Sequence, residues 1–174
     1  MKTSQLILIS TWFQILWFMA ILGTEKWQWV TLSLVVFTIV VSAKYGALRL
    51  DRLLLLFIIG LTIDHTNTFF GLFEFLTAGF PIWLAALWGI FLWYANYLVP
   101  ILNRYPFWAV SIVTGLSGAL SYFAGMKLGA VQFPFDFTLT FMILFAEWAL
   151  MIIVIKRVYR YEYHATNIRS GARH

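Results

Sequence analysis

Long apolar blocks separated by short polar breaks dominate the sequence and limit what the chain can fold into. Each block approaches the roughly 20 residues that a helix needs to cross the hydrocarbon core of a bilayer. The composition agrees, because 62% of the residues are hydrophobic and only 11% are charged. Barrel strands would alternate apolar with polar positions, and the blocks show no such alternation. The sequence therefore predicts an all-α, polytopic integral membrane protein.

Six blocks have the length of membrane helices. We expect one transmembrane domain over residues 1–155 and a basic cytoplasmic tail over 156–174. The first block follows Lys2 as in a signal peptide, but it is long and lacks a small-residue cleavage site, so we expect it to stay in the bundle. The six expected helices cover residues 5–22, 28–43, 53–74, 81–101, 106–126 and 137–155.

Basic residues gather at alternate breaks between the blocks. Six helices place both termini on one side of the membrane, and that side collects ten of the twelve lysines and arginines. They are Lys2, Lys44, Arg49, Arg52, Arg104, Lys156, Arg157, Arg160, Arg169 and Arg173. The other side has only Lys26 and Lys127. Because positive flanking residues are retained in the cytoplasm, we expect six helices with both termini cytoplasmic.

The net charge of +5 follows from this topology and does not require a nucleic-acid partner. We expect no nucleic acid to bind. The bilayer itself is the expected partner, and the tail, where tyrosines alternate with basic residues, is expected to contact anionic lipids of the inner leaflet.

Several kinds of chemistry are excluded by the residues that the chain lacks. Cysteine is absent, which excludes disulfides, thiol nucleophiles and thiolate metal sites. Only one of the three histidines, His65, falls in an expected helix, and no pair has the spacing of a metalloprotease site. Phosphate-binding loops and serine-nucleophile turns are also absent. We therefore expect neither a metal nor a cofactor.

The stretch GLTIDHTNTFFG, residues 60–71, places polar side chains in the middle of the third expected helix. An aspartate at the centre of a membrane helix costs about 2.5 to 3.5 kcal/mol on insertion scales. Asp64, Asn67 and Thr68 share one helical face with Gly60 and Gly71. His65 points about 100° away from that face.

Two further polar residues lie in other expected helices. Glu147 in the sixth is also near mid-depth, and Asn96 in the fourth lies nearer the inner leaflet. We take Asp64, His65 and Glu147 as the candidate catalytic cluster. The candidate binding residues are Asn67, Thr68, Asn96, Ser121 and Tyr122.

Three interpretations of these polar residues remain open. They are interhelical hydrogen-bonding groups, acids and bases acting on a lipid that enters sideways, or proton- or cation-coupled transport sites. For catalysis, burial disfavours the charged form of a carboxyl group, and His65 would be its partner. For transport, the two carboxyl groups occupy corresponding positions in the two halves of the chain. Asp64 is on the third expected helix of the first half, and Glu147 is on the third expected helix of the second half.

Tryptophans and small residues give two packing signals. Trp83, Trp88 and Trp93 recur every five residues, a spacing that distributes them around the helix and favours lipid-facing packing over an aromatic-lined pocket. Small residues in the helix over 106–126 share a face and predict that this helix is central. Its partner is expected within the same chain, and a homo-oligomer formed through the same face is the alternative.

Three segments carry a resemblance to a known family: GLTIDHTNTFFGLFEF, PIWLAALWGIFLWYANYLVPIL and GLSGALSYFAGMKLGAV. They resemble small bacterial inner-membrane proteins grouped as domain of unknown function 2878, over essentially the whole chain. The distinctive matches are Asp64, Pro81, Trp83, Leu84, Trp88, Ser121, Tyr122, Ala124 and Gly125. Where the family often has Gly-Gly-Pro before the Ser-Tyr pair, this chain has Gly118, Ala119 and Leu120.

The resemblance implies a multi-pass protein of the bacterial cytoplasmic membrane and supplies no activity. Genes of this kind often accompany those of fatty-acid-modifying enzymes, which implies membrane lipid modification or lipid handling. A proton- or cation-coupled small-molecule transporter and a non-catalytic accessory membrane subunit are the alternatives.

Overall fold

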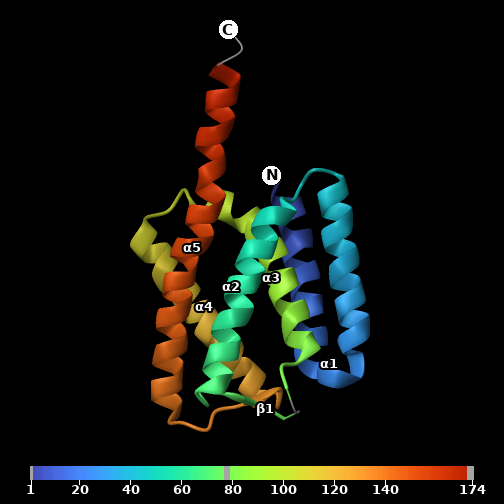
Figure 1. Ribbon diagram of the computed structural model, residues 1–174, viewed down its shortest axis with the longest axis vertical. Helices are drawn as coiled ribbons and strands as arrows, with labels where there is room; N and C mark the ends of the chain where they lie inside the picture. The colour runs from blue at the N-terminus through green and yellow to red at the C-terminus, as the bar shows by residue number, and fades with distance from the viewer. Residues whose placement is uncertain (1, 77–78, 172–174) are drawn as a thin grey trace.

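A computed structural model describes residues 2–76 and 79–171 of the chain, with side chains described through residue 159. The chain is helical apart from two short strands and the connections (Figure 1). Its elements are α1 (Thr3–Lys44), α2 (Leu50–Phe69), β1 (Glu74–Phe75), α3 (Ile82–Leu102), α4 (Phe107–Lys127), β2 (Val131–Gln132) and α5 (Phe137–Gly171). The expected all-α class is confirmed.

The described residues form five helices where six were expected. The difference lies in α1, which runs through both of the first two expected segments without a loop between them. Its path bends at Thr24, whose φ of 38° and ψ of −122° are not helical. The two halves of α1 therefore run antiparallel, side by side (Figure 1).

Two other expected boundaries are wrong. The helix predicted over 53–74 begins at Leu50 and ends at Phe69, because Gly71 adopts a φ of +71° and directs the chain into β1. The helix predicted over 137–155 continues in α5 to Gly171 and projects beyond the rest of the bundle (Figure 1). Much of the predicted tail is thus helical, but its side chains from residue 160 onward lie outside the described residues.

The helices are arranged as two packed pairs joined by α2. The first pair is α1 with α3, and the second is α4 with α5. α2 packs on α3 and also touches α5. β1 and β2 form a two-residue antiparallel ladder, with Glu74 opposite Gln132 and Phe75 opposite Val131. This ladder joins the connections that follow α2 and α4 at one end of the bundle (Figure 1).

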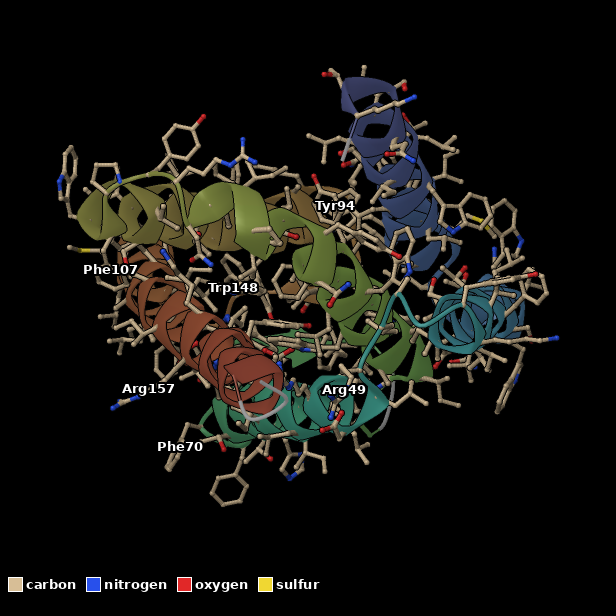
Figure 2. All side chains as sticks on the ribbon, turned by 90° about the horizontal axis from the view of Figure 1, so that it is seen from above. Arg49, Phe70, Tyr94, Phe107, Trp148 and Arg157 are labelled. Atoms are coloured by element: carbon tan, nitrogen blue, oxygen red, sulfur yellow. The ribbon has the colours of Figure 1, made fainter. Side chains whose placement is uncertain are left out.

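The opposite end of the bundle gathers the segments that are rich in basic residues. The N-terminus, the α1–α2 connection, the α3–α4 connection and the projecting part of α5 all lie there (Figure 1). Arg49 and Arg157 belong to this end, and Figure 2, which looks onto it, shows the Arg157 side chain pointing outward. Its assignment to the cytoplasm stays a prediction.

The outward faces of the bundle are apolar. Leu8, Phe37 and Met142 are 71%, 66% and 65% exposed, respectively, and many other large apolar side chains are similarly uncovered. Surfaces of this kind mark contact with lipid or protein. Four stretches of the described residues are long and apolar enough to cross a membrane. They are Thr3–Lys44, Ile82–Leu102, Phe107–Lys127 and Phe137–Tyr159.

The most buried of these four helices is α3, so the prediction that the helix over 106–126 is central is wrong. The lipid-facing assignment of three tryptophans is wrong for the same reason. Trp83, Trp88 and Trp93 are 3%, 5% and 6% exposed, because α3 has neighbours on several sides and buries side chains that point in different directions.

Candidate functional site

Asp64 is the most deeply buried acidic side chain among the described residues, with 1% of its surface exposed. It lies in α2, and each of its carboxylate oxygens accepts one hydrogen bond from a different helix. The indole N–H of Trp88 in α3 donates to Oδ2 at 2.6 Å. The hydroxyl of Tyr122 in α4 donates to Oδ1 at 2.5 Å. One carboxyl group thus links three helices.

A second polar contact lies one turn further along α2. The side-chain amide of Asn67 donates to Oε2 of Glu147 in α5 at 2.7 Å. Asn67 is buried and Glu147 is half-buried. Thr68, by contrast, donates its hydroxyl to the backbone carbonyl of Asp64 within its own helix, at 2.9 Å. Asn67 and Glu147 therefore connect α2 to α5, as Asp64 connects it to α3 and α4.

Two glycines make room for the aromatic rings of this region. A Cβ at Gly60 would lie 2.5 Å from ring carbons of Trp88, and one at Gly118 would lie 2.1 Å from Cγ of Trp148. The two indoles stack at 5.4 Å between centroids and 6° between planes. Seen along the bundle, Trp148 points inward from α5 (Figure 2). Gly60 and Gly118 therefore fix where the stacked pair lies.

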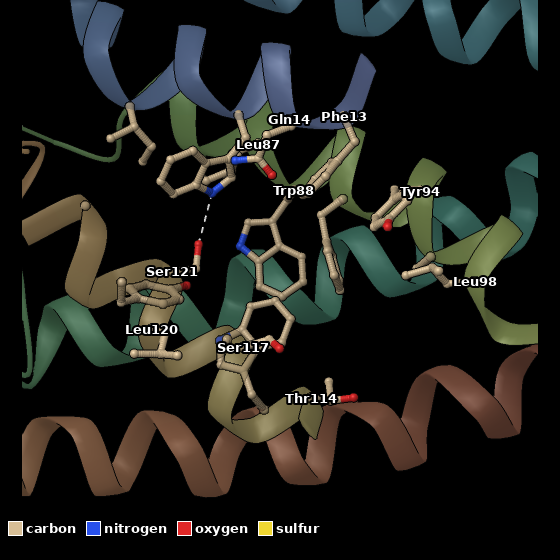
Figure 3. A pocket seen from close by; sticks show the side chains of 18 of the residues that line it. Phe13, Gln14, Leu87, Trp88, Tyr94, Leu98, Thr114, Ser117, Leu120 and Ser121 are labelled. Carbon is tan, nitrogen blue, oxygen red and sulfur yellow. Dashed lines mark hydrogen bonds between the residues drawn. The ribbon is translucent and has the colours of Figure 1, made fainter. Parts of the chain in front are cut away.

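The stacked tryptophans form part of the wall of a cavity of about 520 Å³ (Figure 3). The cavity lies between the first half of α1, α3, α4 and α5. Along α3 it extends from Trp83 to Leu102. At 1.5 Å per residue that is roughly 28 Å, close to the thickness of the hydrocarbon core. The cavity is therefore long and narrow and runs along the bundle.

The cavity wall is mainly aromatic and aliphatic, and none of its described residues is charged. Asp64 and Glu147 are not part of the wall. Asp64 instead lies behind two residues of the wall, Trp88 and Tyr122, and holds both by hydrogen bonds. Where α1 approaches α4, the indole N–H of Trp17 donates to the Ser121 hydroxyl at 3.0 Å (Figure 3).

Of the eight candidate residues chosen from the sequence, Thr68 bonds within its own helix, and the other seven separate into two groups. Asp64, Asn67, Glu147, Tyr122 and Ser121 are brought to the centre of the bundle, in the contacts given above. His65 and Asn96 are not. His65 is exposed, and its nearest ring contact is Phe80, at 6.1 Å between centroids. The amide of Asn96 donates to the carbonyl of Ala47 at 2.9 Å, near the α1–α2 connection.

For Trp88, sequence reasoning favoured lipid-facing packing over the aromatic-lined pocket that it also considered, and it gave Trp17 and Trp148 no role in a site. Trp17, Trp88 and Trp148 all line the cavity, and the first two use their indole N–H groups to bind side chains on other helices. The signal that could have found Trp88 is Gly60, one turn before Asp64. A glycine beside a buried acid leaves space for a large donor from a neighbouring helix. No cluster of three or more potential metal ligands occurs among the described residues.

The fold and the site together define an all-helical, multi-pass membrane protein with an apolar internal cavity backed by a buried polar cluster. The chain belongs to the family described as protein of unknown function DUF2878, which matches residues 6–154. This confirms the resemblance expected from the sequence. No curated protein and no solved structure matches the chain.

Proposed function

We propose that the protein handles membrane lipid by holding a hydrocarbon chain in the cavity between α1, α3, α4 and α5. The observation that carries the proposal is the shape and lining of that cavity. It is long and narrow, extends over roughly the thickness of the hydrocarbon core, and is lined mainly by aromatic and aliphatic side chains. An acyl chain has the same shape and chemistry.

The exposure of two lining residues supports entry from the bilayer. Val113 and Leu120 line the cavity from α4 and are nevertheless 60% and 45% exposed. Helices α1 and α4 make few contacts with each other along this side of the cavity. The hydrogen bond from Trp17 to Ser121 joins the two helices there. A lipid chain could pass between these two helices without leaving the membrane.

Binding fits the geometry better than carboxylate catalysis or ion transport. Both oxygens of Asp64 already accept hydrogen bonds, and the residue lies behind the wall of the cavity. Glu147 is engaged by Asn67 and is also outside the wall. In this proposal Asp64 is a positioning residue that orients Trp88 and Tyr122 against the ligand.

The proposed location is the bacterial cytoplasmic membrane, with both termini inside. The concentration of basic residues at one end of the bundle supports this orientation through the rule that positive flanking segments stay in the cytoplasm. Contact of the basic tail with anionic lipids is proposed on the same grounds.

Native mass spectrometry of the protein released from detergent tests the proposal. The wild type should retain a lipid of defined mass. Ala95 is 5% exposed and lines the cavity, so Ala95→Phe should fill it and remove that lipid. Ala146 is exposed on α5, so Ala146→Phe is the matched control and should keep it. A wild type without lipid, or equal retention by both variants, would count against the proposal.

A further inference from the structure

Three polar side chains of the cavity wall make no side-chain hydrogen bond to any residue that the structure describes. They are Gln14 of α1 and Thr114 and Ser117 of α4. Among the described residues, none of the three forms a side-chain hydrogen bond, whereas their neighbour Ser121 accepts one from Trp17. Figure 3 shows Gln14 on one wall of the cavity and Thr114 and Ser117 on another, with Trp88 between them. Thr114 and Ser117 are three residues apart and so share a helical face.

These side chains lie near the middle of the length of the bundle rather than at either end. Ser117 is ten residues from Phe107 and ten from Lys127, the two ends of α4. On either side of this level the wall is mainly apolar, and its other polar side chains, Tyr94, Ser121 and Tyr122, are already hydrogen-bonded. Leu102 and Ile155 line it towards the basic end, and Ile21 and Val131 line it towards the other. The cavity thus has a polar belt halfway along an apolar channel.

An unpaired polar group is unfavourable at this depth, because the hydrocarbon core offers no water to satisfy it. A glutamine amide and two hydroxyls can each donate and accept. They can therefore pair with an uncharged oxygen-bearing group of a ligand. The wall has no charged residue, so a carboxylate or phosphate placed there would be buried without a counter-ion.

We propose that the bound lipid carries an uncharged oxygen group, an ester carbonyl or a hydroxyl, within its hydrocarbon, and that Gln14, Thr114 and Ser117 recognise it. This inference rests on the proposed function and adds the chemical class of the ligand. The parts of the cavity wall on either side of the polar belt contact the two hydrocarbon arms of the ligand, which flank the oxygen group.

Quenching of tryptophan fluorescence by brominated probes tests this recognition. Trp17, Trp88 and Trp148 line the cavity and report binding. The probes are four chains of equal length brominated at the middle: an alkane, a long-chain ester with its ester group at mid-chain, the corresponding mid-chain alcohol, and a fatty acid kept ionised at alkaline pH. The protein is the full chain in detergent micelles.

The wild type should bind the ester and the alcohol about tenfold more tightly than the alkane, because two or more hydrogen bonds are made. The ionised fatty acid should bind more weakly than either. Replacing the polar groups in Gln14→Leu, Thr114→Val and Ser117→Ala, singly and together, should remove the preference for the ester and the alcohol over the alkane. The control pair Thr62→Val and Ser33→Ala removes hydroxyls that bond to their own helices, and should keep the preference.

The outcomes separate the two proposals. Equal binding of alkane, ester and alcohol by the wild type would overturn the recognition of an oxygen group and leave the chain-binding function standing. Absence of quenching by every probe would overturn both. Because the first comparison uses only the wild type, a variant that fails to fold does not prevent the test.

Discussion

Trp88 donates its indole N–H to Asp64 at 2.6 Å, and its ring stacks on Trp148 at 5.4 Å between centroids. An acid outside the cavity thereby positions part of the cavity wall. Under the proposed lipid-binding function, a buried acid would therefore matter for binding without touching the ligand. The relationship also makes the Asp64 carboxyl group the first target for substitution.

Asp64→Leu should destabilise the protein strongly, because it leaves the donors of Trp88 and Tyr122 buried without an acceptor. Each unsatisfied donor costs about 1 to 3 kcal/mol, so the loss should be about 2 to 6 kcal/mol. Asp64→Asn keeps one carbonyl acceptor, and its amide can donate to the Tyr122 oxygen, so it should lose only about 1 kcal/mol. Thermal unfolding in detergent measures both. A Leu variant as stable as the wild type would refute the positioning role.

Two of the three glycines of α4, Gly118 and Gly125, allow a matched pair of substitutions. Gly118→Ala should destabilise by roughly 1 to 3 kcal/mol, because its Cβ would lie 2.1 Å from the Trp148 ring. Gly125→Ala meets Val131 at 3.5 Å, an ordinary contact, and should be neutral or gain up to about 1 kcal/mol from better helix propensity. Chemical denaturation measures the free energy of unfolding of both variants and tests this difference. Equal effects would mean that Trp148 moves aside without loss.

Ser121→Ala should loosen the α1–α4 side of the cavity, since Trp17 loses the acceptor of its 3.0 Å bond. The expected loss is about 1 kcal/mol of stability. The chain has no cysteine, so spin labels can be placed on Ile15→Cys and Leu116→Cys, both exposed. Pulsed electron paramagnetic resonance should show a longer or broader distance in Ser121→Ala. In the control Ser33→Ala, the distance distribution should match that of the spin-labelled protein without a serine substitution.

The proposed orientation can be tested with single cysteines. Lys26→Cys and Lys127→Cys should react in intact cells with a maleimide that does not cross the cytoplasmic membrane. Arg104→Cys should react only after lysis, because it lies in the α3–α4 connection at the basic end of the bundle. The reverse pattern of labelling would show that the topology is the opposite of the proposed one and would contradict a cytoplasmic tail.

The sequence predicted the class of fold and much of the buried polar chemistry, because block length and the cost of charge in lipid are local properties. It placed α3 and α4 to within a residue or two. It also selected Asp64, Asn67, Glu147 and Tyr122, which the structure brings to the centre of the bundle.

What the sequence could not predict depends on how the helices pack. The sequence already places His65 about 100° from the face of Asp64 but leaves open whether another helix brings a partner to it, and in the structure His65 is exposed. The tryptophans of α3 were assigned to lipid because a five-residue spacing gives no single face. Their burial follows from the position of α3 between α1 and α2, which no pattern within α3 encodes.

The most direct test of the central claim is photo-crosslinking with a phospholipid that carries a diazirine along one acyl chain, followed by peptide mapping, in native membranes. We predict crosslinks to cavity residues of α3 and α4, among them Leu87, Leu98 and Ser117, and their loss in Ala95→Phe but not in Ala146→Phe. Crosslinks confined to outward-facing residues such as Phe37 and Met142, and unchanged in Ala95→Phe, would contradict the claim that a lipid chain occupies the cavity.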